Sequence, residues 1–93
     1  MKHYIICKFK DKNDLETLLP EITELYKRTL EIEGVEDVKV HKSNSERENR
    51  FHIMIEMTLT PEGLEKYDVS EVHHTWKKMY GDRLEGKTIF DCE

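Results

Sequence analysis

The feature that most restricts the fold of this chain is the ten-residue stretch RFHIMIEMTL at positions 50–59. Within it, Phe51, Ile53, Ile55, Met57 and Leu59 alternate with His52, Met54, Glu56 and Thr58. Successive side chains of an extended backbone point to opposite faces, so this pattern predicts a strand with one face in the core. The fold must therefore contain a sheet.

Three other segments have strand patterns. Lys2–Phe9 is apolar at the centre of both faces, which predicts a strand covered on two sides. Val35–Lys42 is predicted to be a second strand, and the segment KTIFDCE at positions 87–93 a last one. The polar run SNSEREN at 43–49 is predicted to be a solvated loop.

The long segment after the first strand has helical spacing. Asn13 begins a capping-box pattern, and Gly34 is predicted to end the helix. Pro20 lies inside the pattern and predicts either a bend or two helical pieces, because proline removes one backbone donor. The apolar residues at helical spacing are Leu15, Leu18, Leu19, Ile22, Leu25, Tyr26 and Leu30.

A second helical region follows the alternating strand. Thr60, followed by proline, is predicted to begin a short helix that ends at Tyr67. Ser70 is predicted to cap a further segment that runs to Tyr80 and stops at the next glycine. The order of elements is then strand–helix–strand–strand–helix–strand.

This order predicts an α+β fold of the ferredoxin-like type, as one domain over residues 1–93. Four antiparallel strands would form the sheet, with both helices on one face. The other face would then expose Tyr4, Ile6 and Met54 to water. A second copy that packs its sheet there would remove this patch, so we expect a homodimer through the sheet face opposite the helices.

Charge and hydropathy exclude several classes of partner. Charged residues make up 38% of the chain and the net charge is −5, with none of the basic stripes that nucleic acid requires. The longest apolar run, YIIC, is far shorter than the roughly twenty residues of a membrane span. The first residues lack the long apolar region of a secretory signal. We therefore expect a cytoplasmic protein that binds neither nucleic acid nor membrane.

The two cysteines, Cys7 and Cys92, have no spacing that is typical of a redox or zinc motif. In the predicted sheet the first and last strands are antiparallel neighbours, which places Cys92 beside residues 2–4. About four residues of strand, roughly 13 Å, would separate the two cysteines, whereas bridged Cα atoms lie within about 7 Å. We expect two free thiols.

Three motifs in this order resemble the stress-responsive α/β-barrel family, known as Dabb. They are KHYIICKFKD near the start, Tyr67 followed by His73 and Trp76, and IFD near the end. The resemblance implies a homodimer whose two sheets close into an α/β barrel, with a cavity between sheet and helices in each subunit. It also implies roles for three residues, because the acid–base pair of a polyketide cyclase in the family matches Tyr67 and His73, and a strand histidine matches His3.

Two positions depart from that cyclase. This chain has Ile53 where the cyclase has a second strand histidine, and Leu25 where it has a helix tyrosine. His52 is expected to point to the opposite face, because one residue of register turns a strand side chain over. Tyr26 lies about 100° around the helix and is expected to replace the missing tyrosine only partly.

The candidate catalytic residues are His73, Tyr67 and His3. His73, Trp76 and Tyr80 share one helical stripe, and His3 shares a strand face with Ile5, so these side chains are predicted to converge on an apolar cavity. His73 is expected to come within hydrogen-bond reach of Tyr67 or of a group on a bound ligand, directly or through one water. An imidazole that accepts a proton beside a phenol that stabilises an oxyanion would suit cyclase-like or lyase-like chemistry on an apolar carbonyl compound. The predicted ligand-binding residues are Ile5, Ile53, Leu25, Trp76 and Tyr80.

A second function stays open at this point. The chain would then be a non-catalytic stress-response or accessory dimerisation domain in which the same histidine and tyrosine side chains only pack. An open cavity of about 300 Å³ or more that reaches His73 would favour the ligand-binding alternative. No cofactor motif is present and no metal is expected, because no pair of histidines has chelating spacing and His73 and His74 diverge by about 100° on a helix.

Overall fold

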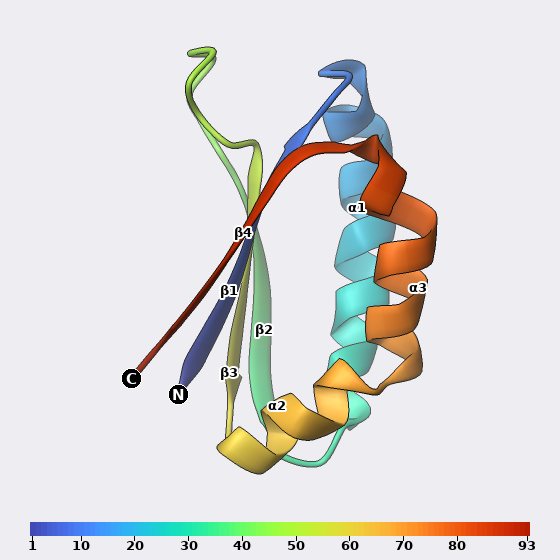
Figure 1. The fold of residues 1–93 in the computed structure, drawn as a ribbon, viewed down its shortest axis with the longest axis vertical. Helices are drawn as coiled ribbons and strands as arrows, with labels where there is room; N and C mark the ends of the chain where they lie inside the picture. Colours follow the sequence, from blue (N-terminus) through green and yellow to red (C-terminus); the bar gives the residue numbers. More distant parts are fainter.

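A computed structural model describes all residues 1–93 as a four-stranded antiparallel sheet with helices on one face (Figure 1). The strands are β1 (Lys2–Phe9), β2 (Val35–Lys42), β3 (Ile53–Leu59) and β4 (Leu84–Cys92), in the spatial order β2-β3-β1-β4. The helices are α1 (Asn13–Lys27), α2 (Pro61–Asp68) and α3 (Glu71–Tyr80), with short 3₁₀ turns at Arg28–Glu31 and Gly81–Arg83. The predicted ferredoxin-like fold is confirmed.

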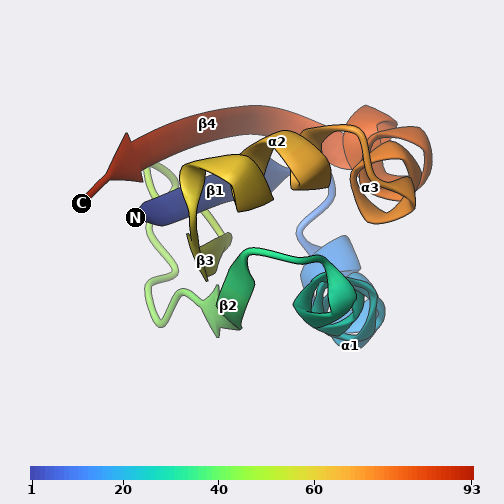
Figure 2. The same ribbon diagram turned by 90° about the horizontal axis from the view of Figure 1, so that it is seen from below.

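The core lies between the sheet and the helices. Seen from below, α1 and α3 lie side by side at the same side of the sheet (Figure 2). Alternate residues of β1 and β3 are buried against them, as the sequence pattern predicts, whereas the intervening residues are only half-buried. Helices cover one face of β1 and no element of this chain covers the other, so cover on both sides would need the expected second copy. None of the helices has the length and apolar character needed to cross a bilayer.

The first helix differs from its prediction at both ends. Asn13 is the first helical residue rather than the cap; its N–H donates to Asp11 Oδ1 at 2.9 Å. Pro20 lies inside a single helix. Beyond Lys27 the chain tightens into a 3₁₀ turn, which changes the angular spacing of the side chains, so Thr29 is buried and the predicted core residue Leu30 is 48% exposed.

The alternating strand begins three residues later than predicted, at Ile53. His52 folds back onto β1, where its Nδ1 accepts a hydrogen bond from the Phe9 N–H at 3.0 Å and its ring stacks on the Phe9 ring. Burial, together with nearby Lys8 and Lys12, lowers the His52 pKa, which favours the neutral ring that can accept this bond. His52 does not reach the helix-side cavity, in agreement with the register argument. Phe51, predicted in the core, is 36% exposed.

Two glycines allow α2 to sit against the start of β2. Gly34 has φ 94°, a conformation that residues with a side chain rarely adopt. A Cβ on Gly63 would lie 2.6 Å from the carbonyl C and O atoms of Gly34. Thr60 joins the two segments, because its N–H donates to Gly34 O at 2.8 Å and its Oγ1 accepts from the Gly63 N–H at 3.0 Å.

The cysteines lie as predicted. Cys92 pairs with Lys2 in the β1–β4 register, and both thiols are free. Cys7 is buried in the core, and burial raises its thiol pKa to about 12. A thiol with so high a pKa carries almost no reactive thiolate near neutral pH.

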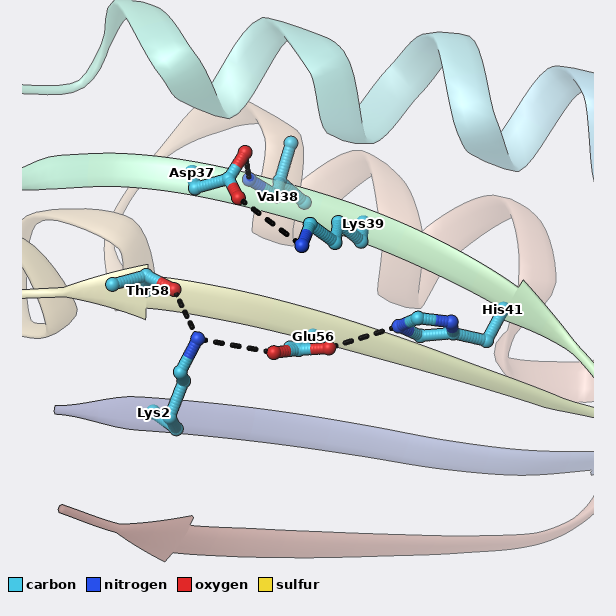
Figure 3. A network of polar contacts seen from close by, with 7 residues as sticks. All are labelled: Lys2, Asp37, Val38, Lys39, His41, Glu56 and Thr58. Atoms are coloured by element: carbon cyan, nitrogen blue, oxygen red, sulfur yellow. Dashed lines mark hydrogen bonds and ion pairs between the residues drawn. The ribbon is translucent and has the colours of Figure 1, made fainter.

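The face opposite the helices, which we call the open face, combines a polar network with apolar side chains. Lys2 Nζ donates to Glu56 Oε2 at 3.0 Å and to Thr58 Oγ1 at 2.8 Å, and His41 Nε2 lies 2.9 Å from Glu56 Oε1 (Figure 3). The hydrogen bonds from His41 and Lys2 lower the Glu56 pKa. Tyr4, Ile6 and Met54 are half-buried on this face rather than fully exposed, and Phe90, next to Tyr4 in register, is 57% exposed.

Candidate functional site

A cavity of about 270 Å³ opens between β1, β4 and the two short helices α2 and α3. Its volume is slightly below the threshold of about 300 Å³ set for ligand binding, yet it reaches His73. Six polar side chains and four apolar ones line it: His3, Tyr67, Asp68, His73, Lys87 and Asp91, with Ile5, Leu64, Trp76 and Ile89. The three candidate catalytic residues therefore lie around one space.

His3 is held in place by the last strand. Register pairs His3 of β1 with Asp91 of β4, and the His3 Nδ1 lies 2.5 Å from Asp91 Oδ1. This bond places the Nδ1 proton on the carboxylate side, which leaves Nε2 to accept a proton. Every fully buried side-chain N or O atom of the chain has a hydrogen-bond partner, whereas His3 Nε2 has none. His3 Nε2 is therefore not fully buried, and it is open to the cavity that His3 lines.

Tyr67, at the end of α2, is buried and forms the back of the cavity. Its hydroxyl lies 2.6 Å from the hydroxyl of Tyr26, which comes from α1. Either hydroxyl can donate this bond. Tyr67 lines the cavity and Tyr26 does not, so we take Tyr26 as the donor, which leaves the Tyr67 proton for a group in the cavity. Burial raises the pKa of both hydroxyls, so Tyr67 is a neutral hydrogen-bond donor near pH 7.

His73 lies at the rim of the cavity rather than in the core. The buried stripe of α3 is Val72, Trp76 and Tyr80, and His73 on its flank is half-buried. The His73 Nδ1 is 2.8 Å from the backbone O of Asp68, and the ring centroids of His73 and Tyr67 are 4.9 Å apart. The predicted direct hydrogen bond to Tyr67 is absent, because His73 Nδ1 donates to the α2 backbone and the Tyr67 hydroxyl binds Tyr26.

The predicted ligand-binding residues separate into two groups. Ile5 and Trp76 line the cavity. Ile53 and Leu25 are buried elsewhere in the core, and neither lines it. Tyr80 also lies outside the cavity; its hydroxyl donates to Glu21 Oε1 at 3.1 Å, and burial raises the Tyr80 pKa to about 12. No group of three His, Cys, Asp or Glu side chains is arranged to hold a metal ion.

Sequence reasoning missed one residue of the site, Asp91, and gave too small a role to another, Tyr26. Asp91 was visible in the IFD motif, and the antiparallel register of the first and last strands would have placed it opposite His3. Tyr26 was expected to help only partly, yet its ring packs at 6.1 Å from Tyr67 and its hydroxyl completes the pair. The helical stripe is wide enough to bury both Leu25 and Tyr26.

A larger hollow of about 560 Å³ lies elsewhere, between the start of α1 and the loop that follows β2. Of the ten residues that line it only Leu15 is apolar, and none of the candidate catalytic residues reaches it. Its walls are surface lysine, serine, asparagine and glutamate side chains, so it has neither the apolar surface nor the convergent groups that a small-molecule site requires.

Comparison with known proteins identifies the fold. No protein-family model and no curated protein matches this chain. A dimeric protein of unknown function from Bacteroides fragilis, with a ferredoxin-like fold, is 14% identical over 99% of this chain and 93% of its own, with a TM-score of 0.82. A Dabb family protein from Mesorhizobium loti, also 14% identical, has the same coverage and a TM-score of 0.75. The chain has the ferredoxin-like fold of the Dabb proteins.

Another solved structure similar to this chain is that of an enzyme. It is the hydroxynitrile lyase from Passiflora edulis, which is 14% identical over 96% of this chain and 87% of its own, with a TM-score of 0.75. At this identity the likeness concerns the fold alone. Folds similar to that of this chain therefore occur both in a named lyase and in a dimeric protein of unknown function.

Proposed function

We propose that this Dabb-like chain forms a homodimer and binds a small apolar carbonyl compound in the His3 cavity, where it carries out cyclase-like or lyase-like acid–base chemistry. The observation that carries the proposal is the convergence of His3, Tyr67 and His73 on one cavity whose walls are partly apolar. Polar groups that converge beside apolar wall residues are a feature of small-molecule sites.

The roles follow from the hydrogen bonds. Asp91 orients the His3 ring, so His3 Nε2 is the base that accepts a proton from a C–H next to the carbonyl, or from a hydroxyl. Tyr67 donates its hydrogen bond to the carbonyl oxygen, where negative charge develops as that proton leaves. His73 Nε2 lies at the rim, where it can exchange protons with solvent or hold a second substrate oxygen.

The experiment is proton exchange on a simple ketone. We expect the protein to accelerate deuterium exchange of the methyl group of acetophenone in D₂O, followed by NMR. His3→Ala should lower the rate by about tenfold or more, because it removes the base. His74→Ala is the matched control: His74 is exposed on α3 and does not line the cavity, so its rate should equal that of the wild type.

Equal rates for His3→Ala and wild type would contradict the proposed chemistry. They would favour the second candidate, a non-catalytic dimerisation domain. One observation favours that candidate: the Tyr67 hydroxyl and the His73 Nδ1 already have partners within the chain. If the chain is such a domain, addition of acetophenone should leave the His3 and Tyr67 resonances unchanged.

The homodimer is proposed through the open face. Neighbours in the fold comparison are described as dimeric, and Phe90, which is 57% exposed next to Tyr4, leaves apolar surface on this face. An obligate interface would bury on the order of 1,500–2,500 Å² in total. Sedimentation equilibrium at micromolar concentration should give twice the chain mass of 11.2 kDa.

Phe90→Asp should shift this equilibrium to the monomer, because it places an unpaired carboxylate in the proposed interface. Met79→Asp is the matched control, since Met79 is 56% exposed on α3, away from the open face. A wild-type monomer at micromolar concentration would contradict the homodimer, whereas an equal loss in both variants would contradict the open face as its interface.

A further inference from the structure

The cavity contains a cation that no carboxylate of the chain neutralises. Lys87 is the only lysine or arginine among its lining residues, and Lys87 takes part in no ion pair or side-chain hydrogen bond. Its neighbours in the sheet differ, because Lys8 pairs with Glu85 and Lys2 with Glu56. A cation without a partner at the edge of a cavity is free to bind an anionic group of a ligand.

Register places Lys87 on the same side of β4 as the proposed base. Lys87, Ile89 and Asp91 pair with Cys7, Ile5 and His3, all of which are buried on the helix side. In β4 these alternate residues point away from the open face, so Lys87, Ile89 and Asp91 form one row along the cavity wall. The row has a cation at one end, an apolar residue in the middle and the Asp91–His3 pair at the other end, about 13 Å away along the strand.

Two further observations locate this charge. The Lys87 side chain is exposed at the edge of the cavity, and its positive charge still acts on the buried Cys7 thiol, where it opposes the effect of burial on the thiol pKa. Ile89, between Lys87 and Asp91, is 46% exposed and offers an apolar wall to the body of a ligand. The two acidic side chains of the lining are Asp91, which is bonded to His3, and Asp68 at the end of α2.

We propose that Lys87 determines ligand specificity by binding a single carboxylate, so that the ligand is an apolar carbonyl compound with one carboxylate at the end remote from its carbonyl. The proposal rests on the proposed function, because it assumes that the carbonyl lies at His3 and Tyr67. The Lys87 ammonium balances one negative charge, and the Asp68 carboxylate, which also lines the cavity, disfavours a second, which selects against phosphates and dicarboxylates.

The test uses two probes that differ only in charge, 4-acetylbenzoate and 4-acetylbenzamide. Each has an acetyl carbonyl at one end of a flat apolar ring, opposite the carboxylate or the amide. Calorimetry and NMR of the His3 and His73 rings at pH 7 measure affinity and place the probe. We expect the wild type to bind the benzoate about two- to fivefold more tightly than the amide, the range for a partly exposed ion pair.

Lys87→Gln should abolish this preference and leave the affinity for the amide unchanged. Lys77→Gln, an exposed lysine of α3 outside the cavity, is the matched control and should keep the preference. The preference should also decrease in 1 M salt, since screening weakens an exposed ion pair.

Each alternative result overturns a defined statement. If both probes perturb His3 and His73 with equal affinity, Lys87 does not select a carboxylate, and the proposed cavity function stands. If Lys77→Gln abolishes the preference as Lys87→Gln does, the effect comes from net charge and the role of Lys87 is wrong. If neither probe perturbs the histidines, the cavity binds no carbonyl compound, and both proposals fail.

Discussion

Gly63→Ala is expected to lower the free energy of unfolding by about 2–3 kcal/mol. A Cβ at this position would lie 2.6 Å from the backbone C and O atoms of Gly34. Backbone atoms cannot rotate away as a flexible side chain can, so α2 would have to move off the start of β2. The movement would also strain the Thr60 N–H to Gly34 O bond of 2.8 Å, which joins the same two segments.

Urea unfolding of wild type and variant gives the difference directly. Gly81→Ala is the control, because a Cβ there meets no atom within 4 Å and the residue has helical backbone angles, φ −51° and ψ −44°. This control should be as stable as the wild type or more stable, because alanine lowers the conformational entropy of the unfolded chain and fits the helical backbone angles of this turn without strain. If Gly63→Ala unfolds at the same urea concentration as wild type, α2 does not pack against Gly34 as closely as described.

The second large effect is expected at the buried tyrosine pair. Tyr67→Phe leaves the Tyr26 hydroxyl buried without an acceptor, which should cost about 1–3 kcal/mol of stability. Tyr26→Phe should cost less, because the Tyr67 hydroxyl lines the cavity, where water can reach it. The two variants are therefore predicted to differ although each removes one hydroxyl from the same hydrogen bond.

A double-mutant cycle measures the coupling. In the variant with phenylalanine at both positions no hydroxyl is left unpaired, so its loss of stability should be smaller than the sum of the two single losses. Additive losses would show that the two hydroxyls, 2.6 Å apart, are not coupled. A larger loss for Tyr26→Phe than for Tyr67→Phe would reverse the assigned donor and acceptor.

The sheet was predictable because its strands follow a period of two. β1 and β2 have the predicted bounds, Lys2–Phe9 and Val35–Lys42. Predictions failed where local geometry changes the period. Leu30 was misplaced because a 3₁₀ turn replaces the last turn of the helix, and Phe51 because the backbone leaves the strand before Ile53. The last strand begins at Leu84, three residues early, beside an irregularity of register at Phe9.

The candidate site was predictable in membership more than in contacts. His3, Tyr67 and His73 line one cavity, but no direct bond joins His73 to Tyr67, because His73 Nδ1 binds Asp68 and the Tyr67 hydroxyl binds Tyr26. The contact through water or to a ligand stays a prediction. Hydrogen bonds between elements depend on the relative placement of helices, which single-chain periodicity does not specify. The hydrogen-bond partners of Tyr67 and His3 come from α1 and β4, so they can be identified only from the folded structure.

The position of β4 has a consequence for the lifetime of the site. β4 is an edge strand held by β1 alone, and its bond from Asp91 to His3 joins residues 88 positions apart. Edge elements of a domain detach at a lower free energy than its centre, in partial openings that leave the rest folded. Detachment of β4 would remove Asp91, Ile89 and Lys87 together and free the His3 ring, while β1 and β3 stay packed under α1. The site would thus be lost in these partial openings although the domain stays folded. A bound ligand would increase the protection of the β4 amides from hydrogen exchange more than that of the amides in any other strand.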